Sequence, residues 1–96
     1  MKFGIILQSN KPEHIWNTLR LGIASLKAGH PVQIFLFSEG VEIEDVADTE
    51  QFDISKKIKE FNDQRGVMLA CETCLNVRSK SESRVLASKV EVLNLP

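Results

Sequence analysis

Short runs of apolar residues recur along the chain and are separated by polar or helix-patterned segments. Three of them, Phe3–Leu7, residues 32–37 and residues 67–70, are almost continuously apolar. Runs of this length and character are typical of buried parallel strands, because both faces of such strands are covered. A fourth run at Val90–Leu93 alternates more with polar residues and predicts a shorter strand at an edge of the sheet.

Two helices are predicted between the first three strands. Asn10 is a suitable cap for the first helix, Pro12 suits its first turn, and Gly29 is a preferred residue just past a helix end. Apolar residues recur along it at helical spacing: Ile15, Trp16, Leu19, Ile23 and Leu26. Asp53 is the predicted N-cap of the second helix, and Gly66 closes it. One face of the second helix is apolar: Ile54, Ile58 and Phe61.

The remaining segments are predicted to be short connections. Residues 41–51 are acidic and weakly periodic, which indicates a surface loop with at most a short helical turn, while residues 72–78 predict a short helix and residues 85–87 one further turn. The resulting order is β-α-β-α-β-α-β, with connections long enough for crossover helices. It predicts an α/β fold, in which residues 1–96 form one three-layer α/β/α domain around a mainly parallel sheet of four to five strands.

The composition narrows the classes of function. The chain has 13 acidic and 12 basic residues, a formal net charge of −1, so we expect no direct nucleic-acid or membrane partner. No apolar run approaches the roughly 18 residues of a membrane-spanning helix. Met1 precedes a strand-like run rather than a secretory signal, which predicts a cytoplasmic protein. Thiols there are mostly reduced, so the two cysteines are expected to be free or catalytic.

The residues most suited to catalysis or binding follow the ends of the predicted parallel strands. Residues 8–10 and 38–40 follow the first two strands, and Cys71 follows the third. In open parallel sheets this edge is where ligands bind. Cys71 is also at the start of the next helix, where backbone N–H groups and the helix dipole favour a thiolate. Cys74 is expected in the first helical turn, near enough to form a reversible disulfide or to resolve a species on Cys71.

Other interpretations of the two cysteines stay open. Both thiols can be packed in the core, because free cysteine is among the most buried residue types. A structural zinc site needs four ligands, and His14 and His30 are the only histidines, with His30 expected at the opposite end of the sheet. A thioredoxin-like site would follow an early strand and open a long helix, unlike this one. No phosphate-binding glycine motif is present, and we expect neither a metal nor a cofactor.

Several polar residues near the same edge are candidates for supporting roles. They are Ser9, Asn10, His14, Glu72, Thr73 and Arg78. His14 can assist a thiol, although a surface position in a first helical turn explains it more simply. Arg78 can stabilise a thiolate or attract an anionic partner, and a cation there also complements the end of a helix.

Three segments carry a likeness to a known family: WNTLRLGIASLKAGHPVQIFLFSEGVE (residues 16–42), FDISKKIKEFNDQRGVMLAC (residues 52–71) and CETCLNVR (residues 71–78). In their order and spacing they resemble the DsrE/DsrF-like family, which includes TusD-type sulfur-relay subunits and YchN-type proteins. With the first strand, the likeness covers most of residues 1–80. Two features depart from the family pattern: Ser79 stands where members usually have Gly, and residues 81–96 are shorter than the usual last helix and strand.

The resemblance implies the fold derived above and a role in handling sulfur as a cysteine persulfide. Cys71 matches the family's sulfur-carrying cysteine, and Cys74 matches a second cysteine found in some members. The resemblance also implies a homo-oligomer, with a trimer or a hexamer among the states it allows, and sulfur donor and acceptor proteins as partners.

The sequence therefore predicts a small cytoplasmic sulfur-relay protein, similar to a sulfurtransferase, that carries sulfur on Cys71 and passes it to an acceptor. Two alternatives from other classes remain. One is a non-catalytic oligomeric assembly or regulatory module with structural cysteines. The other is a dithiol redox protein that cycles through a Cys71–Cys74 disulfide.

Overall fold

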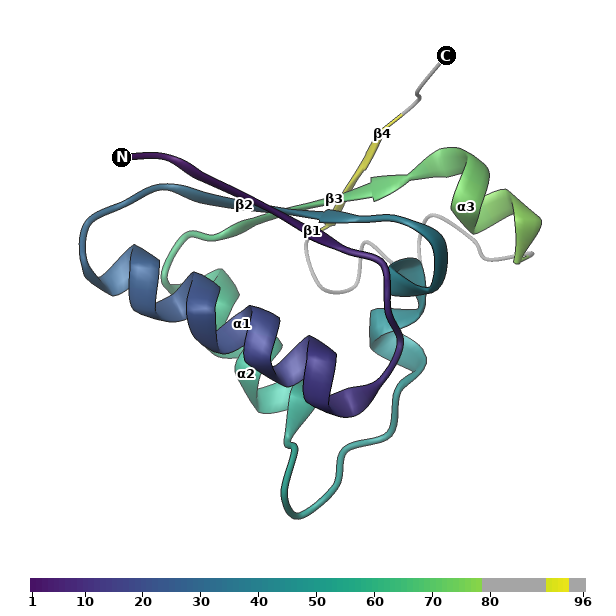
Figure 1. Ribbon diagram of the computed structural model, residues 1–96, viewed down its shortest axis with the longest axis horizontal. Coiled ribbons are helices and arrows are strands. Elements are labelled where there is room, and N and C mark those ends of the chain that lie inside the picture. Colours follow the sequence, from purple (N-terminus) through teal and green to yellow (C-terminus); the bar gives the residue numbers. More distant parts are fainter. Residues whose placement is uncertain (79–89, 94–96) are drawn as a thin grey trace.

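The computed structural model describes residues 1–78 and 90–93. Four parallel strands form one sheet in the order β1-β2-β3-β4 (Figure 1). The strands are β1 Phe3–Leu7, β2 Val32–Leu36, β3 Val67–Cys71 and β4 Val90–Leu93. This confirms the predicted fold class, a small α/β domain with a parallel sheet, and it confirms the last strand as an edge strand.

The strands alternate with helices: α1 Pro12–Lys27, the 3-10 helix η1 Ser38–Asp45, α2 Ile54–Asp63 and α3 Glu72–Val77. Figure 1 shows α1 and α2 side by side on one face of the sheet. The strand order advances in one direction, and right-handed crossovers then place successive connections on the same face. The further turn predicted at residues 85–87 lies outside the described residues. None of the helices in the described part of the chain has the length and apolar character needed to cross a bilayer.

Local sequence features set the helix ends largely as predicted. Pro12 opens α1, and Gly29 follows its end with φ +91°, a conformation that glycine adopts without strain. Asp53 caps α2, because its carboxylate accepts a hydrogen bond from the Lys56 backbone N–H at 3.1 Å. The predicted cap of α1 is wrong: Lys11 occupies the N-cap without a side-chain hydrogen bond.

The core lies between the sheet and the α1–α2 layer. In β2, Val32, Ile34 and Leu36 are buried while the residues between them are partly exposed, so one face of the strand points into the core. The predicted apolar faces of both helices meet this surface. Their buried members are Ile15, Leu19, Ile23, Ile54, Ile58 and Phe61.

The region predicted as a surface loop, residues 41–51, needs a correction in its first part. It begins within η1, and Val41 and Ile43 are each only 1% exposed. They belong to the same core as α1 and α2. Acidic residues interleave with these apolar ones, so the segment shows no regular period although it packs against the end of the sheet.

Candidate functional site

The carboxyl ends of β1, β2 and β3 bring three segments together, as the sequence predicted. The backbone N–H of Phe37 donates to the carbonyl of Leu7 at 3.0 Å and joins the ends of β1 and β2. η1 follows directly and approaches β1 so closely that a Cβ at Gly40 would overlap the Leu7 carbonyl. Glycine is therefore required at this position, and the close contact fixes η1 beside the sheet edge.

Cys71 is both the last residue of β3 and the N-cap residue of α3. Its side chain is only 6% exposed. Its sulfur makes no capping hydrogen bond. The nearby backbone N–H of Cys74 nevertheless lowers the pKa of the Cys71 thiol below its ordinary value. The Cys74 thiol and the Thr73 N–H act in the same direction, whereas burial and the Glu72 carboxylate oppose it. At a given pH, a larger fraction of Cys71 is therefore thiolate than in a free cysteine.

Cys74 links α3 to η1. Its Sγ accepts a hydrogen bond from the backbone N–H of Ser38 at 3.2 Å. Ser38 has φ 51°, a left-handed conformation that is uncommon for residues other than glycine. Cys74 is half-buried against the core, and both cysteines are free thiols. The sequence predicted that Cys74 would lie near Cys71, and the structure adds a backbone donor on its sulfur.

Glu42 is a residue of this edge that the sequence did not single out. Its carboxylate accepts hydrogen bonds from Arg78 Nε at 2.7 Å and from Asn10 Nδ2 at 3.2 Å. The Arg78 and Glu42 side chains are 25% and 29% exposed, so the ion pair is largely shielded from water. Arg78 Nη1 also donates to the carbonyl of Cys74 at 3.2 Å. Glu42 therefore joins the loop after β1, η1 and the end of α3.

The other candidates near the edge form a separate pair. Ser9 Oγ accepts from the Lys11 backbone N–H at 3.0 Å and lies 2.8 Å from His14 Nδ1, at the exposed start of α1. Within residues 1–78 and 90–93, neither Ser9 nor His14 hydrogen-bonds to a cysteine. This pair organises the first turn of α1.

The two histidines lie at opposite ends of the sheet. His30 Nδ1 is 3.1 Å from the amino group of Met1, next to the start of β1, as the sequence predicted. In the described residues, no three His, Cys, Asp or Glu side chains come together as a group that could hold a metal ion.

Comparisons with known proteins agree with this architecture. The structure is similar to the crystal structure of the YchN protein from E. coli, with a TM-score of 0.67 and 18% sequence identity over 96% of this chain and 97% of that one. At this identity the similarity shows the fold alone. No curated protein sequence matches the chain. The sequence model of the DsrE/DsrF-like family matches residues 1–96. Because that match spans the whole chain, the protein belongs to the DsrE/DsrF-like family.

Proposed function

We propose that this protein is a cytoplasmic sulfur carrier that holds sulfur as a persulfide on Cys71 and passes it to an acceptor protein. The observation that supports this most directly is the position of Cys71 at the end of β3, with a pKa below its ordinary value because of the Cys74 N–H. The thiolate is the nucleophilic form of cysteine. Membership of a family that includes sulfur-relay proteins supports the same assignment.

Sulfur transfer at this site is an exchange between sulfur atoms. The Cys71 thiolate attacks the outer sulfur of a donor persulfide, a new S–S bond forms, and the donor cysteine leaves as its thiolate. An acceptor thiolate then attacks the outer sulfur on Cys71, and Cys71 leaves as a thiolate in turn. No external oxidant or reductant is needed, because one sulfur atom moves and each S–S bond that breaks is replaced by another. The N–H groups that lower the pKa of Cys71 also make it a better leaving group.

We assign Cys74 a supporting role. Its sulfur is engaged by the Ser38 N–H, and its backbone N–H acts on Cys71. A second route remains for it, in which the Cys74 thiolate attacks the inner sulfur of the Cys71 persulfide. That step would release hydrosulfide and leave a Cys71–Cys74 disulfide.

Glu42 and Arg78 are the proposed positioning residues. Arg78 bonds both to Glu42 and to the carbonyl of Cys74, the residue whose N–H acts on Cys71. Through these two bonds of Arg78, the ion pair holds α3 beside η1. Partners in this proposal are a sulfur donor protein, an acceptor protein and further copies of the same chain.

The test is sulfur loading. The purified protein is incubated with a cysteine desulfurase and cysteine, and its intact mass is measured with and without a thiol reductant. The proposal predicts a reductant-sensitive gain of one sulfur atom in the wild type and in Cys74→Ser, and none in Cys71→Ser.

The two alternatives give different results in the same experiment. A Cys71–Cys74 disulfide without any persulfide would identify a dithiol redox protein instead. Cysteines that neither load sulfur nor react with iodoacetamide in the native state would identify a structural role.

A further inference from the structure

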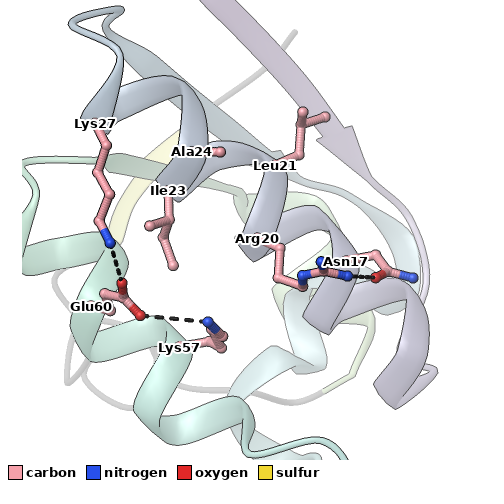
Figure 2. Close-up of a pocket in the computed structure, with 8 residues that line it drawn as sticks. All are labelled: Asn17, Arg20, Leu21, Ile23, Ala24, Lys27, Lys57 and Glu60. Atoms are coloured by element: carbon pink, nitrogen blue, oxygen red, sulfur yellow. Dashed lines mark hydrogen bonds and ion pairs between the residues drawn. The ribbon is translucent and has the colours of Figure 1, made fainter.

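A groove of about 490 Å³ runs between α1 and α2, away from the cysteines. Figure 2 shows the side chains that line it. They are Asn17, Arg20, Leu21, Ile23, Ala24, Lys27, Lys57 and Glu60. Ile23 is buried, whereas Leu21 is 59% exposed and adds an apolar surface to the charged groove.

The groove is basic although the chain as a whole is not. Three of its lining residues are cations and only Glu60 is an acid, whereas the chain has a formal net charge of −1. Two lysines share that acid: the Lys27 and Lys57 ammonium groups lie 3.1 Å and 3.5 Å from the Glu60 carboxylate (Figure 2). None of the ion pairs found in the described residues includes Arg20. The positive charge of the groove is therefore only partly balanced.

Trp16 brings two of these cations together. The Arg20 guanidinium lies 4.7 Å from the centre of the Trp16 ring and the Lys57 ammonium 5.6 Å from it. Both distances are within the range of cation–π attraction. A 3.3 Å hydrogen bond to Asn17 also restrains Arg20 (Figure 2). One aromatic ring thus holds a cation from α1 and a cation from α2 at the same end of the groove.

We propose that this groove binds an acidic, amphipathic segment of a protein partner. Arg20 and Lys27 are seven residues apart on α1, which places them about 10 Å apart along the helix axis. Carboxylates seven residues apart on a partner helix have the same spacing and lie on one face of that helix. An apolar partner residue between them would cover Leu21, and this apolar contact favours a peptide over a nucleic-acid backbone.

The cation–acid contacts already present do not prevent such binding. The Lys27 side chain is 56% exposed, and an exposed ion pair of this kind contributes little to stability. Lys27 can therefore exchange Glu60 for a partner carboxylate. Because the groove lies on α1 and α2 rather than at the cysteine edge, this inference does not depend on the proposed sulfur transfer.

The test is fluorescence anisotropy with a labelled peptide that carries glutamates seven residues apart and leucines between them. We expect the peptide to bind the wild type, and Arg20→Glu and Lys57→Glu to weaken binding at least about tenfold, because each reversal sets like charges against each other. Lys59→Glu is the matched control: it makes the same charge change on α2 outside the groove and should bind like the wild type. Circular dichroism confirms that each variant is folded.

Four results would overturn the proposal. The first is no binding to the folded wild type, and the second is equal binding of a peptide with glutamine in place of glutamate. The third is displacement of the peptide by a short RNA of similar charge, which would point to a phosphate ligand. The fourth is loss of self-association in Arg20→Glu, which would assign the groove to a second copy of the chain. Sulfur loading of the same variants should equal the wild type, so the two proposals fail separately.

Discussion

Replacing Glu42 by glutamine tests the ion pair that connects η1 to α3. The pair joins Glu42 to Arg78 at 2.7 Å, and the two side chains are 29% and 25% exposed, between the surface and the interior. Exposed pairs contribute about 0–1 kcal/mol, whereas breaking a buried pair costs about 3–5 kcal/mol. Glutamine keeps an oxygen acceptor but removes the charge. We therefore expect Glu42→Gln to lower the free energy of unfolding by about 1–2 kcal/mol.

A double-mutant cycle measures the pair itself. Urea unfolding is followed for the wild type, Glu42→Gln, Arg78→Met and the double variant, and the coupling energy is the departure from additivity. We expect a coupling of about 1 kcal/mol, which corresponds to a change in Tm of about 4–8 °C for a domain of this size. The matched control is the exposed Lys27–Glu60 pair, whose cycle should give less than about 0.5 kcal/mol.

The outcome distinguishes a Glu42–Arg78 pair that positions α3 from one that is purely structural. Coupling near zero in both cycles would refute the reasoning, because a shielded pair that holds α3 to η1 must behave differently from an exposed one. A second readout is the rate of Cys71 alkylation as a function of pH. If Arg78 positions α3 relative to Cys71, Glu42→Gln should move that profile to higher pH, whereas a purely structural pair would leave it unchanged in the folded protein.

Three further predictions concern the elements around the site. Gly40→Ala would place a Cβ on the Leu7 carbonyl, so we expect it to destabilise the fold by about 1–3 kcal/mol in urea unfolding; an unchanged midpoint would contradict the close contact. Asp53→Ala removes the acceptor of the Lys56 N–H and should cost about 0.5–2 kcal/mol, seen as a lower Tm, whereas an unaltered Tm would show that the cap contributes nothing. The pKa of the Cys71 thiol is lower in the folded protein than its ordinary value. The free energy of unfolding, relative to that of Cys71→Ala, should therefore rise as pH increases from the folded-state pKa to the ordinary cysteine pKa, and this gain is lost as pH falls through the folded-state pKa. Alkylation of Cys71 should likewise reach its plateau at lower pH than that of a free cysteine, and a profile matching free cysteine would exclude an activated thiolate.

Features that depend on neighbouring residues were predictable from the sequence. α2 is the clearest case, because Asp53 caps the helix three residues before its hydrogen-bond donor and the apolar residues repeat within the same ten-residue segment. The position of Cys71 was predictable for a similar reason. The apolar run of β3 ends at that residue, and the parallel topology then sets the edge at which it lies.

Features that depend on distant contacts were not predictable in this way. η1 is buried together with the close contact between Gly40 and Leu7. The two residues lie on different elements, so no local sequence pattern predicts this contact. Glu42 looks like one of many acids in an acidic segment. Its partners Asn10 and Arg78 lie 32 and 36 positions away in the sequence, so only the folded chain brings the three together.

The measurement that tests the central claim most directly is the location of the transferred sulfur. After loading by a cysteine desulfurase, the protein is alkylated under conditions that preserve persulfides and digested, and the peptide spanning residues 67–78 is sequenced by mass spectrometry. The account predicts one extra sulfur on Cys71 in the wild type and in Cys74→Ser. Sulfur found on Cys74 alone, or on Cys71→Ser to the same extent as on the wild type, would contradict it.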